Sequence, residues 1–426
     1  MKKNILLATF LFAATLSGAA QESELTVTAY KNRVLEYSQQ IKQSAAQRVA
    51  VLEAMRVAKT AFLPKIDFSG NMQYRINDLG MAFGDMSIPM RNESYELQAG
   101  IVQPLYAGGK IHNSYKAAQI KTKIAEQAET LTVDNIIYTA DVSYWSTAAR
   151  KEMYEVMCQY VDIIESLAGV LTDRFEDGLI SRTDLLQVQA RLKEAEIQKT
   201  NAYKGYQLAL QSLNILMGQA PLDAVEIADS ITMYQSLPLK VGNDVAFQNR
   251  PEFKIADLNI QYQERQVKLA KGKYNPSVSI GFKETWGTQM LNIDGSTRFN
   301  SVAFASVSIP LLRWGARFKE TNAQKAILLS QKYERQITED AISKELANAW
   351  TNLTENTKLI EMANASVSIS EDNLDINTFS YNEGKLPILD VLTAQITWVQ
   401  SYNNLVQTWL QQKLSLADYK KAIGTR

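Results

Sequence analysis

The sequence contains one unit twice, and this repetition restricts the possible folds more than any other feature. The segment 174–189 matches the segment 380–395, which lies 206 positions later. Three further pairs keep the same spacing: Pro104 and Pro310, Gly109 and Gly315, and Gly218 and Gly424. Earlier in each half the spacing is 212, because residues 57–64 match residues 269–276, so the first half holds a longer loop between Pro64 and Pro104. Two equivalent halves are therefore expected.

Each half predicts a helix followed by a β-hairpin. The helix should end at Pro64 or Pro276, because the residue before a proline disfavours the α region. From Ile66 to Asn77 apolar and polar residues alternate without a break, as in a strand with one buried face. In the last strand of the second hairpin, 301–309, apolar and polar residues alternate poorly, and this strand is predicted mainly from the repeat. The expected strands lie within 66–77, 95–101, 278–286 and 301–309, and the two hairpins span about 65–104 and 277–310.

A long helical hairpin is predicted after each β-hairpin. Residues 105–220 and 311–386 contain no proline, and apolar residues follow one another in steps of four and three, which is the coiled-coil spacing. The expected helices cover about 110–175 and 180–218 in the first half, and about 316–380 and 387–424 in the second. A helix over 110–175 would be about 100 Å long. The repeats are then 21–218 and 250–426, joined by 219–249.

The first twenty residues predict a secretory signal peptide. Lys2 and Lys3 precede the apolar stretch 5–16, and the small residues 17–20 follow it. The apolar stretch is too short to span a bilayer, so cleavage after Ala20 is expected. No cysteine lies near this point, which argues against a lipid-modified N-terminus. The mature chain should be exported.

Composition excludes several classes of function. Without Lys2 and Lys3 the chain has 43 basic and 45 acidic side chains, so it offers no basic field for nucleic acid. Cys158 and His112 are the only residues of their types, which argues against a disulfide, a multi-histidine metal site or a catalytic triad. No phosphate-binding loop is present. We expect no enzyme, no cofactor and no metal.

Four strands predict an oligomer. Even small closed barrels need about eight strands, and an open edge is not tolerated in lipid. Strands of about 9 to 12 residues match the length that crosses a bilayer when tilted. Tyr74, Tyr95 and Trp286 would supply an aromatic girdle. The alternative is a soluble hairpin sandwich packed on helices.

The duplicated order of helix, β-hairpin, long helix, turn and helix resembles the TolC-like outer-membrane efflux proteins over the whole mature chain. The segments Arg174-Phe-x-x-Gly178 and Phe379-Ser-Tyr381-x-x-Gly384 carry the resemblance. It implies a mixed α/β membrane protein, a homotrimer with a twelve-stranded transmembrane β-barrel and an α-helical coiled-coil tunnel. Such a channel lies in the outer membrane, in contact with its lipid, and extends into the periplasm.

The resemblance also implies partners and a role. Its members act as passive exit ducts of tripartite efflux or type I secretion systems. A periplasmic adaptor (membrane fusion protein) connects them to an inner-membrane pump of the RND, ABC or MFS type. The competing hypothesis is a periplasm-spanning coiled-coil scaffold or adaptor without a pore. A scaffold has no use for two strand pairs of bilayer length, so the hairpins favour the channel.

Candidate site residues follow from the same resemblance. The tips that contact the adaptor are expected at Phe175, Gly178, Tyr381 and Gly384, and Asp184 with Tyr381 should form a constraint that keeps the entrance closed. An arginine of the family on this loop is replaced here by Leu386. The closed entrance should therefore lack one of the polar contacts that hold it shut in the family.

The tunnel aperture of the family carries an Asp-x-x-Asp pair, and the matching residues here are Asp390 and Thr393. In a trimer the three copies of Asp390 would form one ring of carboxylates around the axis, and Thr393 would not supply a second one. The alternative for Asp390 is an exposed residue at a helix N-terminus, stabilised by the helix dipole. Because the sequence stops just after the last helix, the equatorial belt should be small, built from about 219–249 and the N-terminal segment.

Overall fold

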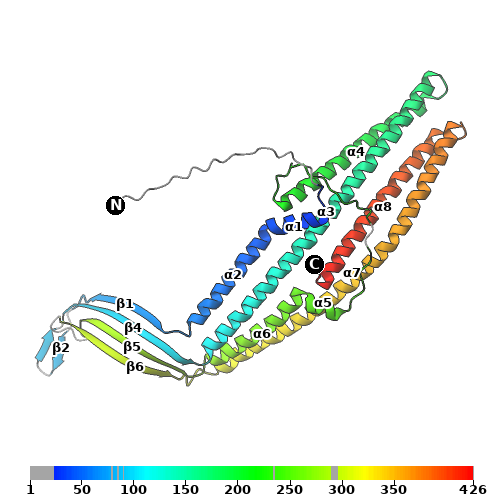
Figure 1. Ribbon diagram of the computed structural model, residues 1–426. Coiled ribbons are helices and arrows are strands. Elements are labelled where there is room, and N and C mark those ends of the chain that lie inside the picture. Colours follow the sequence, from blue (N-terminus) through cyan, green and yellow to red (C-terminus); the bar gives the residue numbers. More distant parts are fainter. Residues whose placement is uncertain are drawn as a thin grey trace, which may run out of the picture. The chain divides into compact units, whose positions relative to one another are not determined.

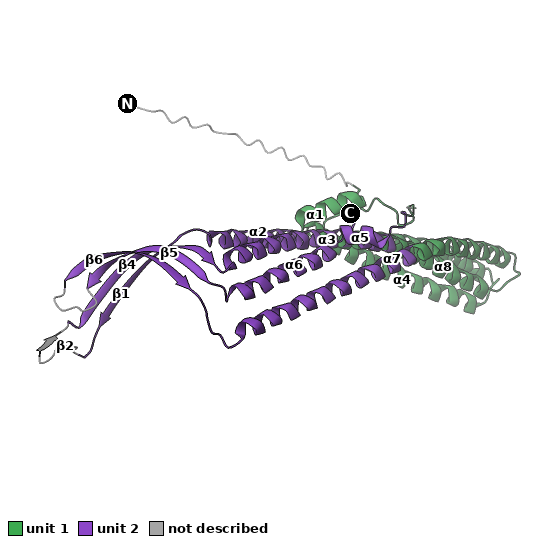
Figure 2. Cartoon of the chain, turned by 90° about the horizontal axis from the view of Figure 1, so that it is seen from below, with its two compact units in different colours: residues 1–38, 139–237, 354–414 green, residues 39–138, 238–353, 415–426 purple. Residues whose placement is uncertain are grey.

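The computed structural model describes residues 24–77, 80–83, 86–89, 91–233, 236–288 and 296–425. The predicted signal peptide lies outside these residues. The chain divides into two compact units, shown in different colours in Figure 2. Unit 1 comprises 1–38, 139–237 and 354–414, and unit 2 comprises 39–138, 238–353 and 415–426.

Unit 2 contains a four-stranded antiparallel sheet in the order β1-β4-β5-β6 (Figure 1). The pairing of β4 with β5 joins the two halves of the chain. A second, two-stranded sheet, β2 with β3, occupies the longer loop of the first half. The bounds are β1 Lys65–Tyr74, β2 Gly80–Phe83, β3 Met86–Pro89, β4 Glu93–Ala107, β5 Ser277–Thr288 and β6 Thr297–Ser308.

Two strand ends differ from the expected positions. Strand β1 ends at Tyr74, three residues before the alternation of its sequence ends. Strand β4 continues beyond Pro104, with a register shift between Pro104 and Tyr106. Proline has no N–H to donate to the ladder, and a bulge lets the strand pass this position.

The helices of unit 2 pack around the sheet-proximal parts of the two longest helices of the chain. Helix α2 (Gln39–Thr60) and α6 (Pro251–Gly272) lead into the two hairpins, and α5 (Asn243–Asn249) precedes α6. Arg250, at the start of α6, is buried and pairs with Glu252 and Glu345 at 2.8 and 2.9 Å. The apolar core here comprises Ala246, Ile342, Leu346, Ala349, Leu353, Leu416, Tyr419, Ala422 and Ile423.

Unit 1 consists of α1 and two helical hairpins. The helices are α1 Val27–Tyr37, α3 Lys110–Glu176, α4 Arg182–Met217, α7 Ala316–Asn382 and α8 Ile388–Ile423, of which α3, α7 and α8 continue into unit 2. One apolar cluster joins both hairpins and includes Ile164, Leu171, Val188, Leu374, Ile388, Val391 and Trp398. In the part of the chain that the structure describes, no helix is both long enough and apolar enough to cross a membrane.

The N-terminal segment and the connection between the repeats pack on α3 within unit 1. Leu25 pairs with Ile227 in a parallel bridge. The hydroxyl of Tyr144, which is fully buried, lies 2.6 Å from the carbonyl oxygen of Leu25 and 2.7 Å from Oδ2 of Asp229. The same carboxylate oxygen accepts a hydrogen bond from the backbone N–H of Val27. These contacts hold the two segments of the expected equatorial belt together.

Candidate functional site

The four-stranded sheet has one apolar face and one polar face. Because paired residues in a sheet point to the same side, the strand register shows which side chains share a face. One row of partners is Ile66, Ile101, Phe282 and Ala303, and another is Gly70, Leu97, Trp286 and Phe299. The opposite face carries the row Ser69, Gln98, Thr285 and Asn300. The alternation predicted in the first hairpin therefore continues across the sheet with exceptions in the second hairpin. Glu284 pairs with Ser301 on the apolar face, and Val302 and Phe304 of β6 lie on the polar face.

Aromatic residues lie at both ends of the apolar face. At the end away from the helices, the rings of Tyr95 and Trp286 have centroids 5.8 Å apart, and those of Trp286 and Phe299 are 6.5 Å apart. At the helix-proximal end, Tyr106 pairs with Val278. From Val278 to Trp286 the strand rises about 27 Å, which is close to the apolar band of an outer-membrane barrel. The arrangement has the dimensions of a membrane-spanning wall.

The sheet has two unpaired edges within the described residues of this chain, β1 and β6. The side chains of β1 are exposed along the whole strand, and most of those of β6 are exposed as well. Apolar side chains such as Phe68, Met72 and Phe299 face solvent in the single chain. An exposed apolar sheet with open edges requires further strands and a lipid environment.

The tips of the two helical hairpins have the same backbone geometry. Gly178 and Gly384 have φ of 74° and 72°, the left-handed conformation that glycine adopts most easily. The N–H of Leu179 donates to the carbonyl of Arg174 at 2.8 Å, and the N–H of Lys385 donates to the carbonyl of Ser380 at 2.9 Å. Each tip is thus closed by a Schellman-type hydrogen bond at equivalent positions of the repeat.

The two tips contact each other through Arg174. Its guanidinium lies 5.4 Å from the centroid of the Tyr381 ring, and its Nη2 donates to Oδ1 of Asn382 at 3.3 Å. The Tyr381 side chain is only 8% exposed and belongs to the apolar cluster of unit 1. We call this contact of Arg174 with Tyr381 and Asn382 the tip clasp.

The structure does not join the predicted pair Asp184 and Tyr381 within the chain. The Asp184 carboxylate accepts a hydrogen bond from the hydroxyl of Ser181 at 2.9 Å, and Ser181 also caps the N-terminus of α4. The hydroxyl of Tyr381 is buried and has no hydrogen-bond partner among the described residues. The Asp184–Tyr381 constraint stays a prediction for the assembled channel.

The predicted aperture residues lie in the first turns of α8. Asp390 is half-buried, and its backbone N–H donates to the carbonyl of Pro387 at 3.2 Å. Thr393 is exposed, and its hydroxyl donates to the carbonyl of Leu389 in its own helix. Both lie on the side of α8 that carries exposed, uncharged polar residues further along the helix: Thr397, Gln400, Asn404, Gln407 and Gln411.

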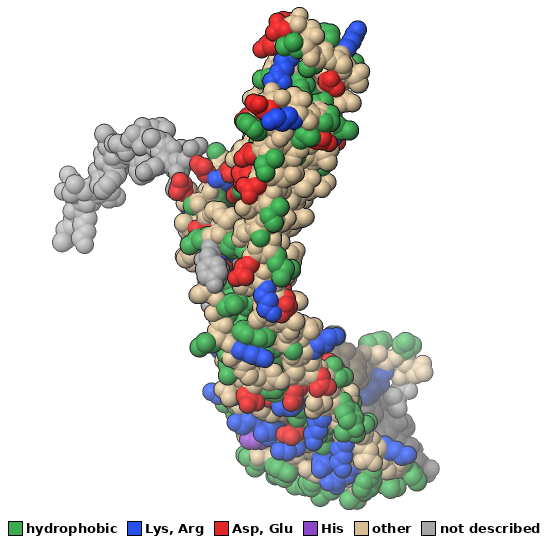
Figure 3. Space-filling model, turned by 90° about the vertical axis from the view of Figure 1, so that its right-hand side faces the viewer, with side chains coloured by type: hydrophobic (Ala, Val, Ile, Leu, Met, Phe, Trp, Pro, Cys, Tyr) green, Lys and Arg blue, Asp and Glu red, His purple; other side chains and the backbone are tan. Residues whose placement is uncertain are grey.

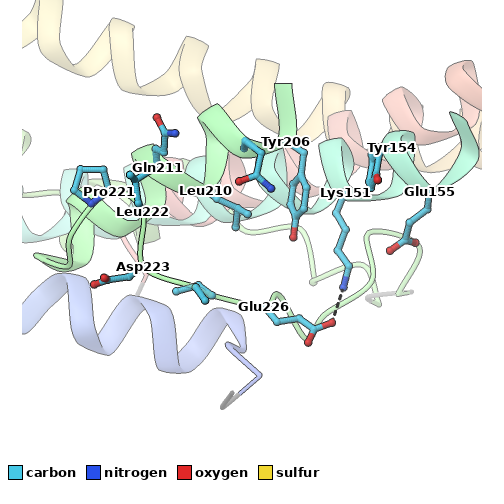
Figure 4. Close-up of a pocket in the computed structure, with 13 residues that line it drawn as sticks. Lys151, Tyr154, Glu155, Tyr206, Leu210, Gln211, Pro221, Leu222, Asp223 and Glu226 are labelled. Carbon is cyan, nitrogen blue, oxygen red and sulfur yellow. Dashed lines mark ion pairs between the residues drawn. The ribbon is translucent and has the colours of Figure 1, made fainter. Parts of the chain in front are cut away.

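A cavity of about 510 Å³ in unit 1 lies between α3, α4 and the segment 221–226 (Figure 4). Lys151 pairs with Glu226 at 3.7 Å there and donates to the carbonyl of Ile227 at 3.1 Å. Its charged group therefore holds the connecting segment against α3. No residue of the predicted tips or aperture lines this cavity.

Sequence reasoning did not assign a role to Arg174. The residue belonged to the motif that marks the first tip, but its contact with Tyr381 is made across 207 positions. A pairing of a cation with an aromatic ring at such a distance has no periodic signal. Comparing the charges of the two tips would have pointed to it, since Ser380 stands at the equivalent position of the second repeat.

A sheet with one apolar face, attached to long helical hairpins, defines a membrane-inserted channel protein with a helical extension. Residues 31–219 and 244–425 match the outer membrane efflux protein family, and the chain belongs to this family. The predicted family and the mixed fold are thus confirmed, and the chain is an efflux protein of the outer membrane. The family is one of transport proteins, not of enzymes.

Relatives and solved structures agree with this assignment. The chain is 23% identical to the outer membrane protein TolC of Vibrio cholerae, over 100% of this chain and 96% of that protein. It is 20% identical to TolC of Escherichia coli K12, over 97% and 85% of the two chains. A crystal structure of CusC has a TM-score of 0.81 at 13% identity and covers 95% of this chain and 93% of its own.

Proposed function

We propose that the chain is one subunit of a homotrimeric outer-membrane exit duct that passes substrate out of the cell through a pore lined by three copies. The observation that carries the proposal is the sheet, which has one apolar face, aromatic residues at both ends of it, and two unpaired edges. A scaffold or adaptor without a pore would leave this apolar face without a function.

The directions of the edge strands support closure by further copies. Strand β1 runs away from the helices and β6 runs back toward them. Pairing β6 of one copy with β1 of the next therefore keeps every neighbour antiparallel. Three copies supply twelve strands, an even number as in bacterial outer-membrane barrels.

The helices of unit 1 carry apolar surface that assembly would bury. On α7, Met362, Ile369 and Ile376 are exposed at intervals of seven residues, which is the spacing of a coiled-coil seam. On α4, Leu186, Ile197, Leu208 and Ile215 are exposed. Neighbouring copies would cover these stripes and form the wall of the tunnel.

The tips are the surface on which we place the adaptor. Phe175, Gly178 and Gly384 are exposed at the ends of the two hairpins, next to the clasped Tyr381. The adaptor would connect them to an inner-membrane pump, which supplies the energy. The chain itself performs no catalytic step in this proposal. Asp390 and Thr393 would line the narrowest part of the tunnel.

The test is to purify the full-length protein from outer membranes and measure mass and conductance together. A mass of three chains in mild detergent, with discrete current steps in planar bilayers, is expected. A trimer without conductance would favour the scaffold, and a water-soluble single chain as the main form would contradict the architecture.

A further inference from the structure

The four junctions between strands and helices carry a strong excess of positive charge. The segments 56–65, 105–125, 265–276 and 309–325 lie next to the helix-proximal end of β1, β4, β5 and β6. They contain fifteen Lys and Arg and one acidic residue, Glu320, whereas the whole chain has 45 of each sign. Lys and Arg gather over this end of the helices in Figure 3. Glu320 already pairs with Lys273 at 2.8 Å, so most of this charge is not neutralised by carboxylates of these segments.

The junction after β6 combines this charge with exposed apolar side chains. Leu311 is 91% exposed, Trp314 is 88% exposed, and Leu312 and Phe318 are also exposed. Arg313 and Arg317 alternate with them and are exposed as well. We call residues 309–318 the interfacial segment. Large apolar residues interleaved with arginine are typical of a membrane–water interface, where the rings and stems contact acyl chains and the guanidinium groups reach the headgroups.

The segment continues the membrane-facing side of the sheet. Val307 pairs with Val278 on the apolar face. The exposed apolar residues Ile309 and Leu311 follow Val307 in the same two-residue steps. Tyr106, at the equivalent end of β4, pairs with the same Val278 and lies on this face as well. The interfacial segment thus begins where the apolar band ends.

Trp314 occupies an unfavourable backbone position. Trp314 has a φ of 47°, and no other non-glycine residue among the described residues has a positive φ. The next residue, Gly315, has a φ of 77°. The N–H of Ala316 donates to the carbonyl of Arg313 at 2.8 Å, so the two residues are the centre of a tight turn. Turns with two positive φ angles favour Gly, Asn and Asp. The first repeat follows this rule, with Gly108 and Gly109 at the equivalent positions.

The two repeats differ here for a physical reason. A Cβ on Gly108 would lie 2.4 Å from the carbonyl oxygen of Gly272, so the first repeat has no room for a side chain at this position. In the second repeat a bulky side chain is retained despite the backbone strain. Local strain of this kind persists only where the surrounding structure imposes it, and such positions cluster at functional sites.

We propose that the interfacial segment anchors the channel in the headgroup layer of the membrane leaflet at the helix-proximal end of the barrel and binds anionic phospholipid. Trp314, Leu311 and Phe318 contact the acyl chains near the headgroups, and Arg313 and Arg317 bind the phosphates. The inference rests on the proposed function, because it requires the sheet to lie in a bilayer.

The test measures contact of Trp314 with lipid. The full-length channel is reconstituted into phosphatidylcholine vesicles that contain phosphatidylglycerol, with bromine placed near the headgroup of one lipid or the other. Bromine quenches tryptophan fluorescence on contact. Trp314→Phe identifies the share of Trp314 among the six tryptophans of the chain. We expect this share to be quenched in both lipids, and at lower lipid fractions by brominated phosphatidylglycerol.

The charge variant Arg313→Gln/Arg317→Gln tests the headgroup contact. Each cation near an anionic surface strengthens the attraction about fivefold, so losing two should lower the preference for phosphatidylglycerol about 25-fold. The matched control is Lys193→Gln/Lys358→Gln, which removes two exposed lysines from α4 and α7 in unit 1 and should leave the preference unchanged.

Three results would overturn the proposal. If neither brominated lipid quenches the fluorescence of Trp314, this residue is covered by protein, for example by a second copy of the chain. A preference that survives in the charge variant means that other groups bind the lipid, and an equal loss in the control means a non-specific charge effect. Conductance of the same vesicles separates these results from failure of the proposed function, because a channel that conducts normally without quenching refutes only the anchor.

Discussion

Replacing Arg174 with alanine tests whether the tip clasp holds the tunnel entrance in one state. The guanidinium lies 5.4 Å from the Tyr381 ring and donates one hydrogen bond, at 3.3 Å, to Asn382. An exposed cation–π contact contributes about 0.5–1 kcal/mol, and a long, exposed hydrogen bond contributes roughly 0.5 kcal/mol. Each clasp is therefore worth about 1 kcal/mol. If opening of the entrance separates the two hairpins, loss of the clasp favours the open state about fivefold in each subunit.

Three copies make the expected effect large enough to measure. If the subunits open together, about 3 kcal/mol is lost and the ratio of open to closed channels rises on the order of 150-fold. If they open independently, the entrance should show intermediate current levels, each shifted about fivefold. Single-channel recordings in planar bilayers distinguish the two cases. Arg182→Ala is the control, since Arg182 is an exposed arginine at the start of α4 on the same tip.

A double-mutant cycle with Tyr381→Leu tests the origin of the effect. If Arg174 acts through the ring, removing it in the Tyr381→Leu background should change opening much less than in the parent. Open probability in Arg174→Ala that equals that of the parent and of Arg182→Ala would refute the reasoning. It would mean that the entrance does not open between these two hairpins.

Three further predictions concern the tips, the aperture and the core. Gly178→Val and Gly384→Val should each lower the stability of the tip by on the order of 1 kcal/mol or more, because φ is positive at both positions. Export should fall while native gels still show trimers. Gly169→Ala, inside α3, is the control. Asp390→Asn should abolish most cation selectivity and block by multivalent cations in bilayer recordings, with a smaller change in conductance. Burial raises the pKa of Tyr30 to about 12, so its contribution to stability should be constant below pH 10 and fall between pH 10 and 12; thermal melts of Tyr30→Phe should show a smaller loss over this range than those of the parent.

The secondary structure could be predicted because its signals are local and occur twice. The alternation that begins at Ile66 predicts a strand, and β1 begins one residue earlier. The steps of three and four residues predict α3 and α7, which both have 67 residues. Strand β6 alternates poorly, and its position is predicted mainly from the repeat. The structure places it at Thr297–Ser308, against the expected 301–309.

Side-chain contacts between the repeats could not be predicted, because they depend on how two hairpins pack. The resemblance to the family proposed Asp184 as the partner of Tyr381, whereas in the single chain Asp184 contacts Ser181 and the ring of Tyr381 contacts Arg174. Asp184 lies three residues after Ser181, a spacing that favours a local cap over a distant contact. A sequence shows that Asp184 has a possible local partner in Ser181, but it does not show whether the local or the distant contact forms.

The tip clasp depends on divergence between the two halves of a duplicated chain. Arg174 is equivalent to Ser380 in the repeat, and Phe175 is equivalent to Tyr381. With identical halves, both tips would carry an arginine or neither would, and two arginines facing each other would repel. An arginine on one tip and a tyrosine ring on the other give attraction within each subunit. In a trimer the six tips then alternate, so that contacts within a subunit differ from contacts between subunits. In the proposed channel, that difference would let an adaptor separate the hairpins of one subunit without dissociating the trimer, because the exposed stripes on α4 and α7 lie outside the clasp.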